Sequence, residues 1–131
     1  MVTGEPVAAV EFELARAREL VAAADHLRVG GFHTDAVSRA YYASFHAAMA
    51  LLASIGRSVR THDGLRAVIG EHFVRPGKLD PRFGRLLART AADRNDADYN
   101  VATVFEASDA AEAVAGARDF IAAVEALLAQ G

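Results

Sequence analysis

Apolar residues recur at every third or fourth position through most of this chain, which is the spacing of one face of an α-helix. The first such stripe consists of Val10, Leu14, Ala17, Val21, Ala24 and Leu27. It predicts a helix over residues 6–29, which Pro6 can begin because the first helical position needs no backbone N–H. Gly30 and Gly31 are expected to end this helix, since glycine adopts the left-handed conformation without steric cost.

The next segment, residues 34–55, is apolar over most of the helical circumference. A helix of this kind is buried on several sides, so we expect it to be the central helix of the fold. Thr34 has the hydroxyl of a typical N-cap, and Gly56 follows the last apolar residue.

Two further helices follow, each with a recognisable beginning. Thr61 is a candidate N-cap for a shorter helix over residues 62–73. Asp80 followed by Pro81 is the combination of a cap and a first helical residue, and it predicts a helix over residues 81–98.

Ser108 is the candidate cap of a last helix, residues 108–129. No segment shows the alternation of a strand. The sequence therefore predicts a single all-α domain over residues 1–131, an up-and-down bundle of four long helices and one short helix.

Composition narrows the possible chemistry. Apolar residues make up 53 % of the chain, enough for a core, and there is no cysteine. Disulfides, thiolate zinc sites and cysteine nucleophiles are thereby excluded. The first residues lack the pattern of a signal peptide, and the longest apolar run, residues 40–55, is too short to span a bilayer comfortably. We expect a cytoplasmic protein.

Charge is distributed unevenly along the chain. Residues 57–94 contain nine basic and four acidic side chains, whereas residues 95–131 contain one basic and seven acidic. The basic middle segment can meet a phosphate backbone or an acidic partner, or it can simply be a solvated helix surface.

Three separate motifs resemble one known family. They are SRAYYASFHAAMALL at residues 38–52, THDGL at residues 61–65, and DPRFGRLL at residues 80–87, continuing to RNDADY at residues 94–99. In this order and spacing they are similar to the HEPN domain, in the branch of small stand-alone bacterial and archaeal proteins. The resemblance covers about residues 31–121.

The resemblance implies a helical bundle that forms a homodimer. In the family, an Arg followed after four to six residues by a His carries the chemistry, and paired copies of this motif line a cleft that cleaves RNA without a metal or other cofactor. Many members are toxins encoded beside a minimal nucleotidyltransferase antitoxin. That partner can silence the toxin by adding a nucleotide to a tyrosine near the motif.

Here Arg94 matches the family's Arg, and Asn95 matches the polar residue that often follows it. Tyr99 stands in place of the His, and Val101 stands where the toxins often have a tyrosine. Two functions therefore remain open. The chain is either a toxin-type endoribonuclease or a non-catalytic module that binds nucleotide or RNA, or pairs with a nucleotidyltransferase.

The residues of this motif suggest their own roles. Arg94 can hold a phosphate through a bidentate fork. A tyrosine with a pKa near 10 is a poor base at neutral pH, but Tyr99 can donate a proton or hydrogen bond. Asn95 lies four residues before Tyr99 on the same helix face, and Asp98 lies four residues after Arg94, with which it can form a simple ion pair. These four residues are the candidate catalytic set.

Candidate RNA-binding residues lie elsewhere. Arg39 and His46 share a face of the central helix with Tyr42, so His46 is either a hydrogen-bonded core histidine or a ligand for RNA. His62 either helps to cap its helix in solvent or contacts RNA. We interpret Tyr41 and Tyr42 as core or dimer-interface residues. The five histidines lack the spacings of zinc sites, so no metal is expected.

Overall fold

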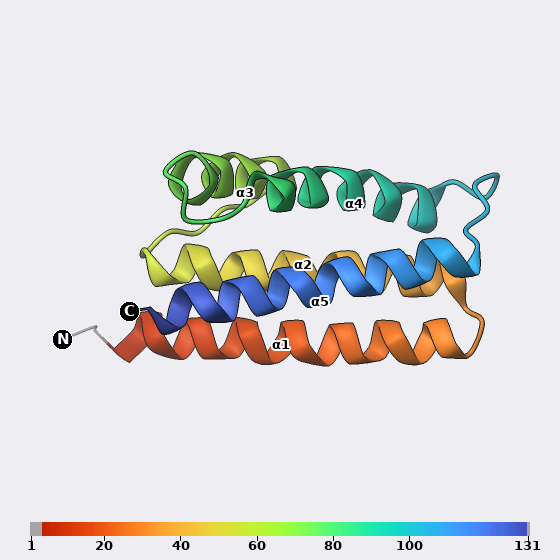
Figure 1. Ribbon diagram of the computed structural model, residues 1–131, viewed down its shortest axis with the longest axis horizontal. Helices are drawn as coiled ribbons and strands as arrows, with labels where there is room; N and C mark the ends of the chain where they lie inside the picture. Colours follow the sequence, from red (N-terminus) through yellow and green to blue (C-terminus); the bar gives the residue numbers. More distant parts are fainter. Residues whose placement is uncertain (1–3, 131) are drawn as a thin grey trace.

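A computed structural model describes residues 4–130, and within them it contains five α-helices, one π-helical turn and no β-strand. The helices are α1 (Gly4–Val29), α2 (His33–Ser54), α3 (His62–Ile69), α4 (Pro81–Tyr99) and α5 (Ala107–Ala129), and the π-helical turn η1 is Gly70–Val74. In Figure 1, α3 and α4 lie above the layer formed by α1, α2 and α5. The predicted all-α bundle is confirmed, with α3 as its short helix.

Helix α2 is the centre of the bundle, as its apolar circumference predicted, and it packs against each of the other four α-helices. Its contact surface is made mainly of small side chains, which allow neighbouring helices to approach closely. Six alanines of α2 are buried: Ala36, Ala40, Ala43, Ala47, Ala48 and Ala50. Leu51 and Leu52 of α2, together with Phe120 of α5, are fully buried and fill the remaining volume.

Two of the predicted caps are present. The Thr61 side chain accepts a hydrogen bond from the backbone N–H of Gly64, 2.9 Å away, and thereby begins α3. The Asp80 carboxylate accepts from the backbone N–H of Arg82, also at 2.9 Å, and Pro81 occupies the first turn of α4.

The other two predicted caps are wrong. Helix α2 follows Phe32 directly and includes Thr34, because Gly31, at a φ of 86°, has already reversed the chain. Helix α5 begins before Ser108, because Glu106 and Asp109 form a capping box in which each side chain accepts from the other residue's backbone N–H. A carboxylate box spaced three residues apart therefore replaces the expected serine cap.

Other helix boundaries also differ from those predicted. Helix α1 begins at Gly4 rather than Pro6, and α4 extends to Tyr99. The third helix is regular only to Ile69 and then widens into η1. The Phe73 carbonyl accepts from the backbone N–H groups of both Lys78 and Leu79, which directs the chain toward the start of α4. No helix in the described part of the chain is both long and apolar enough to cross a membrane.

Candidate functional site

Arg94 of α4 lies against two tyrosines of α2. Its guanidinium carbon is 5.3 Å from the centre of the Tyr41 ring and 5.7 Å from that of Tyr42. The two rings meet edge to face, with centroids 5.4 Å apart. The Arg94 side chain is only 15 % exposed. A guanidinium desolvated against aromatic faces is held by about 0.5–2 kcal/mol of cation–π attraction, so α2 fixes the position of this charge.

The hydrogen bonding of Arg94 is incomplete. Its Nη1 lies 3.9 Å from Asp98 Oδ2, an ion pair that is too long for a hydrogen bond. The other Asp98 oxygen accepts from the Ser38 hydroxyl at 2.7 Å. Arg94 Nε is buried and has no partner within residues 4–130. An unpaired buried donor costs about 1–3 kcal/mol. The Nε atom itself is closed to ligands, so an anion can reach this guanidinium only through the 15 % of the side chain that is exposed.

His62 joins this cluster through Tyr41. Its Nδ1 is hydrogen-bonded to the Tyr41 hydroxyl. Its ring also packs on Phe45, with centroids 4.7 Å apart. Because Thr61 caps α3, His62 is held at the first position of that helix, directed toward α2. The cluster of Arg94, Tyr41 and His62 therefore joins three different helices.

Burial and nearby positive charge set the protonation states in this cluster. Burial lowers the pKa of His62 below its ordinary 6.5, and the charges of Arg94 and Arg66 lower it further. Burial raises the pKa of Tyr41 above 10.0, although the charge of Arg94 opposes this. At neutral pH His62 is therefore an uncharged imidazole, which can either give or accept a proton, beside an intact phenol.

A polar groove adjoins the cluster. It is a cavity of about 260 Å³, lined by Arg16, Leu20, Ser38, Arg39, Tyr42, His46 and Asp98. Two predicted RNA-binding residues, Arg39 and His46, thus lie together with Asp98. His46 is partly exposed, and its Nδ1 lies 3.1 Å from Glu13 Oε1 of α1.

Two members of the predicted catalytic set lie apart from Arg94. Asn95 is exposed, and Tyr99 is 74 % exposed. Five residues along an α-helix correspond to a rotation of about 140° from the starting side chain, so Tyr99 lies on another side of α4 from Arg94. Within one chain, the imidazole that is joined to Arg94 through Tyr41 is that of His62. Sequence reasoning missed the link through Tyr41, which belongs to an apolar helix and carries the pattern of a core residue.

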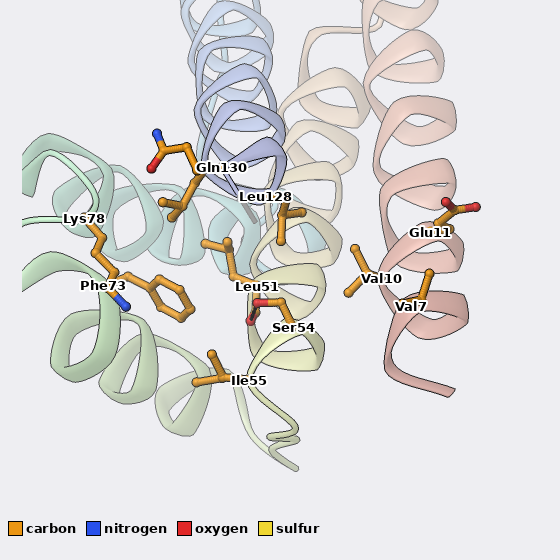
Figure 2. A pocket seen from close by; sticks show the side chains of 11 residues that line it. Val7, Val10, Glu11, Leu51, Ser54, Ile55, Phe73, Lys78, Leu128 and Gln130 are labelled. Atoms are coloured by element: carbon orange, nitrogen blue, oxygen red, sulfur yellow. Dashed lines mark hydrogen bonds between the residues drawn. The ribbon is translucent and has the colours of Figure 1, made fainter. Parts of the chain in front are cut away.

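A second cavity, of about 630 Å³, lies where α1 begins and α5 ends, and it shares no residue with the cluster or the groove. Leu51, Phe73 and Leu128 line it, and Figure 2 shows the Glu11 carboxylate directed away from the other labelled side chains. Its walls are mainly apolar and offer few groups for acid–base chemistry. Nowhere in residues 4–130 do three His, Cys, Asp or Glu side chains stand together as a metal site would require.

Comparison with known proteins places these residues inside a family match. The model of the HEPN domain matches residues 10–127. A UPF0332 protein of Thermotoga maritima is 32 % identical over 119 residues, covering 91 % of this chain and 90 % of that protein. A protein of Methanocaldococcus jannaschii named "Putative toxin" is 37 % identical over 83 residues, covering 63 % and 62 %. A UPF0332 protein of Archaeoglobus fulgidus is 34 % identical over 92 residues, covering 70 % and 73 %.

Proposed function

This chain belongs to the HEPN domain family, and from that premise we propose that it binds RNA and cleaves it without a metal ion at the site around Arg94. The observation that supports this most directly is the mostly buried Arg94 guanidinium, which within residues 4–130 has only a long ion pair of 3.9 Å with Asp98. It stacks on Tyr41, which is in turn bonded to His62. A phosphodiester oxygen is an acceptor that the exposed part of this guanidinium can bind.

The cleavage step follows from these groups. The 2′-oxygen of the RNA attacks the adjacent phosphorus, the bond to the 5′-oxygen breaks, and a cyclic phosphate forms. Arg94 holds the phosphate and stabilises the negative charge that grows on its oxygens. One proton must leave the 2′-hydroxyl and one must reach the departing 5′-oxygen.

His62 can serve both proton transfers in turn, because its Nε2 can first take a proton and then give it up. When Nδ1–H donates to the Tyr41 oxygen, Nε2 presents a lone pair that accepts the 2′ proton. Once Nε2 has taken that proton, the ring is a cation, and it can pass the proton to the leaving 5′-oxygen and return to its neutral form. The lowered pKa of His62 keeps the base form available at neutral pH.

A cleavage assay with a fluorescein-labelled single-stranded RNA tests this function. Wild-type protein should cut the RNA, whereas Arg94→Ala and His62→Gln should each lose about 10²-fold or more, the usual size of a general acid–base contribution. Tyr99→Phe should retain activity because Tyr99 lies away from Arg94. Arg85→Ala, an exposed arginine of the same helix, is the matched control.

Intact RNA after incubation with folded wild-type protein would contradict the proposal. Loss of activity in Tyr99→Phe with full activity in His62→Gln would instead show that Tyr99, and not His62, transfers the proton.

A second candidate function is favoured by the 74 % exposure of Tyr99. An exposed phenol can accept a nucleotide from a minimal nucleotidyltransferase partner, as the family resemblance suggests. In that case incubation of the two proteins with ATP adds the mass of a nucleotide to wild type and nothing to Tyr99→Phe. An unchanged mass in wild type removes this candidate.

Both candidate functions fit a toxin–antitoxin system. In such a system this chain acts as the toxin and forms a homodimer. The name of the Methanocaldococcus relative, "Putative toxin", supports the toxin part of this proposal. Induced expression of wild type should then arrest bacterial growth, and Arg94→Ala should not.

A further inference from the structure

The groove beside Arg94 is formed where α1 and α4 flank α2 without packing against each other. Its floor is α2, one wall is α1 with Arg16, and the other is the end of α4 with Asp98. Tyr42 belongs both to the groove and to the aromatic surface under Arg94. A ligand held by Arg94 can therefore continue directly into the groove.

Two arginines dominate the charge of this groove. Arg39 is exposed and makes no ion pair within the described residues. Arg16 is paired with Glu19 at 2.6 Å, but both side chains are largely exposed, at 44 % and 72 %. Exposed pairs of this kind contribute little, so Arg16 can share its charge with a phosphate.

Two carboxylates in or beside the groove already have partners. The Asp98 carboxylate accepts from the Ser38 hydroxyl and lies 3.9 Å from Arg94. Glu13 is bonded to His46. Among the described residues, Arg39 is an arginine of the groove without an ion-pair partner.

We propose that Arg39 and Arg16 form a second phosphate subsite, which holds the backbone of a single-stranded RNA next to the phosphate bound by Arg94. This inference rests on the proposed function, because it takes RNA as the ligand. The groove volume of about 260 Å³ lies below the range of about 300–1,000 Å³ typical of pockets for drug-sized ligands. It suits a phosphate and its neighbouring sugar edge better than a whole nucleotide.

Salt-dependent binding tests this subsite. The probe is a fluorescein-labelled oligouridylate with 2′-O-methyl groups, which prevent attack by the 2′-oxygen, and binding is followed by fluorescence anisotropy. For a single strand, each phosphate contact contributes about 0.7 to the slope of log affinity against log salt. Arg39→Gln and Arg16→Gln should each weaken binding and make the slope shallower by about 0.7. Arg39→Lys, which keeps the charge, should restore most of the slope.

The control is Arg85→Gln, which removes the same charge from α4. Arg85 is exposed and stands nine positions before Arg94, which places it about 180° away around the helix. Its slope should equal that of wild type.

The results of this binding test distinguish the proposed subsite from the proposed RNA-binding function on which it rests. If wild type binds the probe and Arg94→Ala weakens binding, but Arg39→Gln and Arg16→Gln match wild type, the subsite is overturned and RNA binding stands. Equal losses in Arg39→Gln and Arg85→Gln also overturn it, because the effect is then one of net charge. No binding by wild type overturns both proposals together.

Discussion

Tyr41 is the residue that contacts both Arg94 and His62. The guanidinium of Arg94 packs over the face of the Tyr41 ring, and the Tyr41 hydroxyl is hydrogen-bonded to the imidazole of His62. Neither interaction is visible in the sequence. Arg94 and Asp98 are four residues apart on one helix, so their pairing could be predicted from spacing alone. His62 and Tyr41 are 21 residues apart on different helices, and only the packing of α3 on α2 brings them together.

The ring of His62 makes stability depend on pH in a defined direction. Its pKa in the folded protein is lowered by burial and by Arg94 and Arg66, so the unfolded chain binds the proton more readily. Stability is therefore lost as the pH falls below about 6.5, the unfolded value, toward the folded pKa. Thermal unfolding at pH 7.5 and at pH 5.5 measures this loss.

The melting temperature of wild type should fall more between these two pH values than that of His62→Gln, which has no imidazole to protonate. Groups common to both proteins, such as Asp93, cancel in this comparison. Equal losses in the two proteins would show that His62 is not desolvated as described.

Helix ends decide where the site residues stand. The predicted caps Thr61 and Asp80 are confirmed because each combines a short polar side chain with an adjacent helical segment. Thr34 and Ser108 also combine a short polar side chain with an adjacent helical segment, but neither of them begins its helix. A glycine turn begins α2 before Thr34, and the box between Glu106 and Asp109 begins α5 before Ser108. Local sequence preference therefore identifies candidate N-caps, and competition between neighbouring candidates decides at which residue the helix begins.

The Thr61 cap carries a prediction for α3 as an element. Thr61→Ala removes the acceptor for the Gly64 N–H and should lower the free energy of unfolding by about 1 kcal/mol, measured by urea denaturation. Because His62 follows the cap directly, the same change should also lower RNA cleavage. Thr61→Ser keeps a hydroxyl and should stay close to wild type in both measurements. A full loss of stability in Thr61→Ser would show that packing of the methyl group, and not the cap, fixes this helix end.

On the scale of the whole molecule, α2 links the cluster around Arg94 to the polar groove. The apolar circumference of α2 predicted its central place, and the structure bears this out. The groove could not be predicted, because it depends on α1 and α4 flanking α2 at a distance. Arg16 of α1 stands far from any motif in the sequence, and only this arrangement of helices brings it beside Arg39.

The contact through Tyr41 also predicts whether each copy of the chain in the proposed homodimer holds a complete site of its own. Arg94 and His62 both contact Tyr41 within one chain, so each protomer of the proposed homodimer should hold a complete pair. Arg94→Ala and His62→Gln protomers, co-expressed with different tags and purified through both, should therefore be as inactive as either variant alone. Wild type purified in the same way with Arg94→Ala should retain about half of wild-type activity, since one of the two symmetric sites stays intact. If mixing the two inactive variants restores activity to about that level, Arg94 of one copy works with His62 of the other, and the site is shared across the dimer.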